Sequence, residues 1–103
     1  MTTFRTGLAL AMVLGGPAAA QTQDALYVKS LAATCAGCHG TDGKAADGSS
    51  IASIAGMPKE YLSAQLKAFK AGTRPATVMH QLSKGYSDAQ IEQLAGYFAG
   101  QKK

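Results

Sequence analysis

The 103-residue chain contains no tryptophan, only two cysteines and only six acidic residues. Its large apolar residues are scattered among many alanines and 12 glycines. Domains of this size bury limited apolar surface and often need a crosslink or a bound group to be stable. We therefore expect a thin protein core, and a cysteine count of two excludes a disulfide-dense scaffold as the source of stability.

Charge of one sign is not concentrated anywhere along the chain. Ten Lys/Arg residues face six Asp/Glu residues, a net charge of +4, and no dense basic run is present. A nucleic acid is therefore not expected as a partner. The sequence also lacks a Ser/His/Asp set, a phosphate-binding glycine loop and paired carboxylates, so we do not expect the isolated chain to be an enzyme.

A long hydrophobic run is also absent, and the one short run has the form of an export signal. Arg5 precedes an apolar stretch at residues 7–16, and residues 17–20 supply the small-residue pattern of a cleavage site. The run is too short to span a membrane comfortably. We expect residues 1–20 to be a cleaved signal peptide and residues 21–103 to be one soluble periplasmic domain, with a net charge of +3 and no membrane insertion.

The most informative segment that is present reads Cys35-Ala36-Gly37-Cys38-His39, the C-x-x-C-H pattern of a c-type haem attachment site. Two thiols three residues apart lie on one face of a helical turn and can add across the two vinyl groups of one porphyrin. The imidazole of His39 then lies under the iron, where a neutral ring nitrogen ligates it. The motif predicts one covalent haem c and one-electron transfer.

Three other interpretations of the cysteines are open. A disulfide between Cys35 and Cys38 would close a ring too small to stabilise the domain much. A C-x-x-C redox centre usually lies in a βαβ unit, and no strand pattern is visible. A zinc site needs two further ligands, and His39 and His80 are the only soft donors available. The histidine after Cys38 and the export signal favour haem over all three.

The apolar periodicity predicts an all-α fold without internal repeats. We expect helices at residues 24–33, 58–71 and 88–99, a short helical piece at 77–83 and a loop at 40–57. Ser87 with Gln90 forms a capping box at the start of the last helix, and Gly72 and Gly100 end the second and last helices.

Each long helix is expected to bury one face. The three stripes are Leu26, Tyr27, Ser30, Leu31 and Thr34 in the first helix, Tyr61, Leu62, Gln65, Leu66 and Phe69 in the second, and Ile91, Leu94, Ala95 and Phe98 in the last. Gly96 inside the last helix costs stability relative to alanine, so we expect another helix, the first one, to cross closely there. In the loop, Ile51 and Ile54 are expected to turn inward against the porphyrin.

The sixth position of the iron has four candidates: Met79, His80, Met57 or no ligand. We favour Met79, because it lies in a short segment between two breaks, where the chain can return across the opposite face of the haem. A thioether ligand favours ferrous iron and raises the reduction potential. His80 follows Met79 directly and points about a quarter-turn away. Met57 precedes Pro58 at a helix entrance, where a methionine is expected to pack.

The histidine ligand also needs its second ring nitrogen held, which fixes the tautomer of the imidazole. We expect a backbone carbonyl in the loop at residues 49–54 to accept this hydrogen bond.

The whole mature chain resembles a small class I cytochrome c of the c4 and c553 type. The resemblance rests on C-A-G-C-H-G at residues 35–40, Ile54-Ala55-Gly56, Tyr61-Leu62 through Gln65-Leu66 and Phe69, Met79, Lys84-Gly85, Ser87-Asp88 and Tyr97-Phe98. It implies three main helices plus a short one wrapped around one covalent haem, with thioethers at Cys35 and Cys38 and axial ligands at His39 and Met79. One departure concerns the loop: class I cytochromes often place there a proline whose carbonyl orients the histidine, and residues 49–56 contain no proline.

A narrower resemblance concerns the cytochrome subunit of flavocytochrome c sulfide dehydrogenase. It rests on residues 31–41 together with Lys84-Gly-Tyr-Ser87 and Ala95-Gly-Tyr-Phe98. It implies a FAD-containing sulfide-oxidising flavoprotein as partner, with the cytochrome as the non-catalytic relay. The alternatives are a free soluble carrier between a respiratory complex and a terminal oxidase, with other redox proteins as partners, and a gas-binding haem protein.

Overall fold

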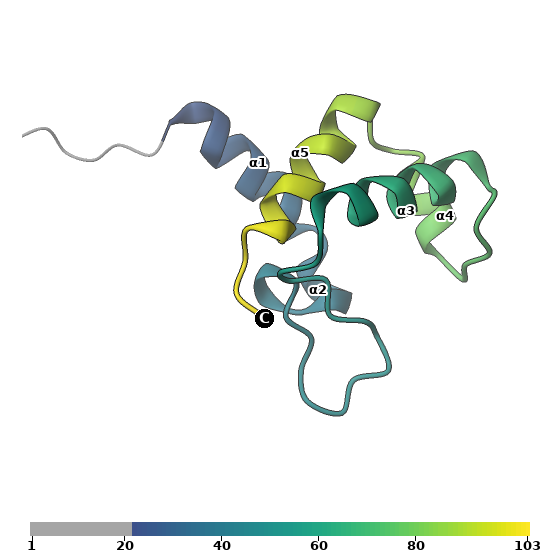
Figure 1. The fold of residues 1–103 in the computed structure, drawn as a ribbon, viewed down its shortest axis with the longest axis horizontal. Helices are drawn as coiled ribbons and strands as arrows, with labels where there is room; N and C mark the ends of the chain where they lie inside the picture. Colours follow the sequence, from purple (N-terminus) through teal and green to yellow (C-terminus); the bar gives the residue numbers. More distant parts are fainter. Residues whose placement is uncertain (1–21) are drawn as a thin grey trace, which may run out of the picture.

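The structure, a computed structural model, describes residues 22–103, and the predicted signal peptide lies outside these residues. The described part is helical and contains no strand. Its elements are α1 (Gln23–Ala33), α2 (Ala36–His39), the short 3₁₀ helix η1 (Thr41–Gly43), α3 (Lys59–Ala71), α4 (Met79–Ser83) and α5 (Asp88–Ala99) (Figure 1). The all-α prediction of three main helices is confirmed, with three short helical elements, α2, η1 and α4, in place of the one expected.

Helix α5 lies at the centre of the packing. It crosses α3 and also contacts α1, while α4 packs against α3. The core cluster consists of Ala32, Leu62, Leu94, Ala95 and Phe98, and Ile91 is fully buried beside it. The apolar stripe predicted for the last helix is thus confirmed, and the small number of large buried side chains agrees with the thin core expected from the composition.

Local signals in the sequence set the helix boundaries. The Thr22 hydroxyl accepts a hydrogen bond from the amide of Ala25 (3.2 Å) and caps α1. Ser87 and Gln90 form the predicted capping box at the start of α5. Gly72 ends α3 in the left-handed conformation, with φ at 77°, which glycine adopts without steric cost. All three long helices lie within one residue of their predicted bounds, because these signals act locally.

Two predicted faces are partly wrong. Leu26 and Tyr27 in α1 remain about half exposed (48% and 47%), and the residue that α1 buries is Ala32. The reason is geometric: the first turn of α1 extends beyond its neighbours (Figure 1), and Tyr27 reaches α5 through its hydroxyl, which accepts a hydrogen bond from Gln90, so the last turn of α1 joins the core cluster. On α3, Leu62 is buried as expected but Tyr61 is 46% exposed.

The explanation expected for Gly96 is also wrong. A Cβ added at this position would meet the side chain of Lys59, from the first turn of α3, at 3.7–3.9 Å. That separation is an ordinary van der Waals contact, and no atom of α1 lies among the nearest neighbours. The residue above Gly96 is therefore a flexible lysine of α3, and close packing does not require glycine here.

No helix in residues 22–103 combines the length and the apolar character needed to cross a membrane.

Candidate functional site

The C-x-x-C-H segment forms one compact turn directly after α1. The amide of Cys35 donates to the carbonyl of Ala32 (3.1 Å), and the amide of His39 donates to the carbonyl of Cys35 (2.9 Å). Cys38 and His39 belong to α2, with Cys35 as its N-cap residue. Both cysteines are free thiols, so the structure contains no disulfide between them. The turn therefore presents two thiols and one imidazole from neighbouring positions.

The two thiols differ in their surroundings. Cys38 is exposed, whereas Cys35 is partly buried. Burial raises the pKa of the Cys35 thiol, and the neighbouring Cys38 adds to the rise. Within the described residues, no cluster of three potential ligands gathers for a metal ion.

The imidazole of His39 is held in one defined orientation. Its Nδ1 lies 2.6 Å from the backbone carbonyl oxygen of Ala52. A carbonyl oxygen only accepts, so Nδ1 carries the proton and donates it, and Nε2 keeps its lone pair for a metal. The expected acceptor in the loop at residues 49–54 is thereby confirmed and identified, even though the loop lacks the usual proline.

Backbone contacts close to His39 position the carbonyl of Ala52. The carbonyl of Gly43 accepts from the amides of Ile54 (2.8 Å) and Ala55 (3.1 Å), and the Ser53 hydroxyl accepts from the amide of Ala45 (2.8 Å). These bonds fix the residues on the C-terminal side of Ala52. We call residues 35–57 the histidine arm.

The chain conformation at Gly40 lets this arm fold back. Gly40 has φ 84° and ψ 166°, a combination essentially restricted to glycine. An added Cβ would overlap the carbonyl oxygen of Lys44. The glycine that follows His39 is therefore required for the turn that brings the loop back to the imidazole.

The candidates for the sixth ligand lie in different environments. Met57 packs against the core cluster, as expected. Met79 is the first residue of α4, is partly buried and is not among the residues packed on that core. The adjacent His80 has its Nδ1 covered by the protein, without a hydrogen-bond partner. In Figure 1, α2 and α4 are drawn on the same side of α3, toward its two ends. We call residues 75–86 the methionine arm.

The residues around these donors suit a porphyrin. The three exposed aliphatic side chains of the two arms are Ile51 of the histidine arm (42% exposed) and Val78 and Leu82 of the methionine arm (52% and 53%). Ile54 differs, because it packs against the core cluster. Two thiols on one turn, an imidazole with a free Nε2, a thioether at the start of α4 and uncovered apolar side chains form a donor set whose chemistry fits haem c.

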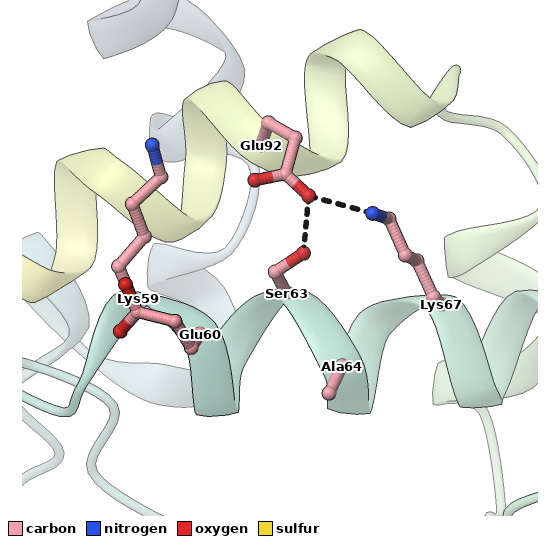
Figure 2. Close-up of a pocket in the computed structure, with 6 residues that line it drawn as sticks. All are labelled: Lys59, Glu60, Ser63, Ala64, Lys67 and Glu92. Atoms are coloured by element: carbon pink, nitrogen blue, oxygen red, sulfur yellow. Dashed lines mark hydrogen bonds and ion pairs between the residues drawn. The ribbon is translucent and has the colours of Figure 1, made fainter.

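A cleft of about 410 Å³ between α3 and α5 is a different feature. Figure 2 shows its six residues, with Ser63 and Lys67 directed at the same carboxylate oxygen of Glu92. The Lys67 ammonium lies 2.7 Å from that oxygen, and these hydrogen bonds hold the pKa of Glu92 below its ordinary value. None of the expected haem residues lines this cleft, so the cleft lies apart from the candidate site. The hydrogen bonds across it join α3 to α5.

Two tyrosines, one bonded to the histidine arm and one to the residue directly before it, make contacts that no sequence pattern signalled. Tyr97 of α5 donates a hydrogen bond to the carboxylate of Asp42 in η1, and this bond, followed by burial, raises the pKa of Tyr97 to about 12. Tyr86 of the methionine arm lies 2.8 Å from the hydroxyl of Thr34. Partners separated by more than 50 residues share no local periodicity, so only the folded chain reveals such pairs.

The sequence is similar to cytochromes over most of its length. Residues 18–98 match a protein family described as cytochrome C oxidase, cbb3-type, subunit III. The chain is 45% identical over 73 residues to the cytochrome subunit of sulfide dehydrogenase from Chlorobaculum tepidum, covering 71% of this chain and 64% of that protein. It is 38% identical to a thiosulfate dehydrogenase electron acceptor of Thiomonas intermedia (66% and 31%). It is 34% identical to cytochrome c4 of Azotobacter vinelandii (77% and 41%). The matched region spans less than two thirds of each relative.

Proposed function

The chain belongs to this cytochrome c family, and on that basis we propose that it transfers single electrons through one covalently bound haem c. The observation that carries the proposal is the hydrogen bond from His39 Nδ1 to the carbonyl of Ala52, next to two free thiols on the same turn. That bond directs the lone pair of Nε2 outward as an iron ligand. Bound haem c supplies the one-electron Fe(III)/Fe(II) couple.

The residues of the chain have separate tasks in this proposal. Cys35 and Cys38 each add one thiol across one vinyl group: sulfur bonds to the carbon next to the ring, and the thiol hydrogen goes to the outer carbon. The addition is redox neutral and needs no leaving group. His39 and Met79 would ligate the iron, and the exposed apolar side chains of Ile51, Val78 and Leu82 would cover apolar porphyrin surface.

Intact-mass measurement tests the attachment. The full chain, expressed in a host with a haem ligation system, should gain the mass of one haem that survives denaturation. Replacing both Cys35 and Cys38 by serine should abolish the gain. A wild-type protein without covalent haem contradicts the proposal.

Alanine variants at the three candidate positions test the sixth ligand. Met79→Ala should remove the far-red methionine-to-iron band of the ferric protein, whereas Met57→Ala and His80→Ala should keep it. Retention of the band in Met79→Ala contradicts the ligand assignment. A wild-type spectrum without any methionine band contradicts the assignment of Met79 and favours either ligation by His80 or a gas-binding haem protein with an open position.

We further propose that the chain is the electron-accepting subunit of a sulfide-oxidising flavoprotein in the periplasm. The similarity to the cytochrome subunit of sulfide dehydrogenase supports this assignment. In such a complex the FAD-containing partner catalyses sulfide oxidation, and this chain accepts the electrons one at a time without being an enzyme itself. The similarity to an electron acceptor of thiosulfate dehydrogenase fits the same chemistry of reduced sulfur.

A free soluble carrier is the second candidate, supported by the similarity to cytochrome c4. Purifying the untagged protein from its own cells distinguishes the two. Flavin that co-elutes with haem in a fixed ratio supports the subunit, and a lone small haem protein supports the free carrier. Size-exclusion chromatography with absorbance recorded for both cofactors provides the readout.

A further inference from the structure

The methionine arm is joined to the rest of the protein by one conspicuous hydrogen bond. The Tyr86 hydroxyl, on the turn after α4, lies 2.8 Å from Oγ1 of Thr34, the residue directly before Cys35. Among the described residues, no other hydrogen bond connects residues 75–86 to another part of the chain. The helix α4 itself packs against α3 and makes no comparable contact with α1 or α2.

The direction of this bond follows from its neighbours. The Thr34 hydroxyl lies 2.7 Å from the carbonyl oxygen of Leu31, which can only accept, so Thr34 uses its single hydrogen there. The Tyr86 hydroxyl must therefore donate to Thr34. The result is a chain of two hydrogen bonds, Tyr86 to Thr34 to Leu31, in which each bond polarises the next.

The bond joins the two segments that would carry the two axial ligands. Thr34 immediately precedes the turn that presents Cys35, Cys38 and His39, and Tyr86 follows the five-residue helix that begins at Met79. A helix this short has little stability of its own and depends on tertiary contacts. A methionine side chain is also flexible and does not fix its own position.

We propose that Tyr86 is a positioning residue that holds Met79 at the distance from His39 at which the thioether binds iron well. This inference rests on the proposed function, and specifically on Met79 as the sixth ligand. Loss of the Tyr86 hydroxyl leaves the arm attached by packing alone, that of α4 on α3 and that of the Tyr86 ring on the core cluster. The methionine-to-iron bond then breaks more often, and an external ligand competes more successfully for the ferric iron.

Tyr86→Phe in the haem-loaded protein tests the inference, because it keeps the ring and its packing and removes the donor. The loss of a neutral hydrogen bond changes an equilibrium constant, here that of the competition between Met79 and an external ligand for the iron, by about 2- to 10-fold. We expect imidazole to bind the ferric variant about 2- to 10-fold more tightly, the far-red methionine band to weaken and the reduction potential to fall. Thr34→Val removes the acceptor and should have the same effect, and the double variant should be no worse than either single variant.

Tyr27→Phe is the matched control. The Tyr27 hydroxyl also takes part in a 2.8 Å hydrogen bond between distant elements, accepting from Gln90 of α5, but this bond joins α1 to α5 and includes no residue of either arm. This control should leave the imidazole affinity, the band and the potential at wild-type values. An equal shift in Tyr27→Phe, or no shift in either Tyr86→Phe or Thr34→Val, overturns the positioning role. A wild-type protein that lacks the methionine band overturns the assigned ligand and this role together, whereas an intact band with an unaffected Tyr86→Phe overturns the role alone.

Discussion

The two arms that would face the haem are built in different ways. The histidine arm carries hydrogen bonds within its own loop and is tied to α5 twice, by the amide of Gly56 to the carbonyl of Phe98 (2.8 Å) and by Tyr97 to Asp42. The methionine arm packs against α3 and has the single tie from Tyr86 to Thr34. The histidine arm is thus fixed by several independent contacts, whereas the methionine arm is fixed by few.

This difference assigns separate roles to the arms. A multiply held imidazole keeps its orientation and its proton on Nδ1 when one contact is lost. A singly held thioether responds to each change in its surroundings, and the axial ligand is one of the main determinants of haem potential. Substitutions in the histidine arm should therefore change whether the site forms, and substitutions in the methionine arm should change how it is tuned.

Gly40→Ala is expected to have the largest effect, because it breaks the histidine arm at its turn. The backbone conformation at Gly40 disfavours any Cβ, and the added methyl would overlap the carbonyl of Lys44. We expect a loss of about 3 kcal/mol or more in the free energy of unfolding, together with poor haem incorporation. Denaturant titration and the haem-to-protein ratio measure both quantities, and a wild-type ratio with unchanged stability would contradict the required turn.

Leu94→Ala comes next and weakens the core on which both arms rest. Leu94 is 1% exposed, and the cavity left by its truncation should lower the free energy of unfolding by about 2–5 kcal/mol. Because neither arm loses a hydrogen bond, the reduction potential should stay at the wild-type value. A large change of potential at native conditions would show that the core and the arms are coupled more closely than their contacts indicate.

Tyr97→Phe removes one tie of the histidine arm and should have a smaller effect of about 1 kcal/mol. The pKa of Tyr97 is raised in the folded protein to about 12 from 10.0, so its stabilisation is fully present below pH 10 and is lost as the pH rises through 12. The stability difference between wild type and variant should vanish over that interval. Denaturant titrations at pH 8, 10 and 12 measure this stability difference. These pH values span about 2 units on either side of an ordinary tyrosine pKa.

The spectrum of Tyr97→Phe sharpens the comparison of the arms. Its far-red methionine band should stay at the wild-type strength, in contrast to Tyr86→Phe. Weakening of the band in Tyr97→Phe to the same degree would mean that the two arms do not have separate roles.

Gly96→Ala should have the smallest effect and the opposite sign. The added Cβ would meet only the side chain of Lys59 at ordinary contact distance, and alanine favours the helix by up to about 1 kcal/mol. Thermal unfolding should therefore shift upward slightly, with the haem spectrum unchanged. A marked destabilisation would mean that α3 and α5 approach more closely at this point than the structure indicates.

Much of the fold follows from local signals along the chain. The Ser87–Gln90 capping box, the left-handed Gly72 and the helical spacing of apolar residues in α5 each act within a few residues, so the bounds of the three long helices could be predicted to within one residue. The short piece expected at residues 77–83 begins two residues later, at Met79, and η1 lies in the segment predicted as a loop. The buried face of α1 could not be predicted, because burial depends on how far a helix reaches past its neighbours. The same applies to Gly96, whose neighbour Lys59 comes from another helix.

The sequence by itself determined the chemistry of this protein: two thiols and an imidazole on one turn, a thin core and an all-helical framework, all encoded in spacings of a few residues. The tertiary structure alone decided which carbonyl orients His39 and that Tyr86 joins the methionine arm to Thr34. These pairings join residues separated by 13 to 52 positions. They arise only when packing brings distant segments together, so no periodic pattern in the sequence records them.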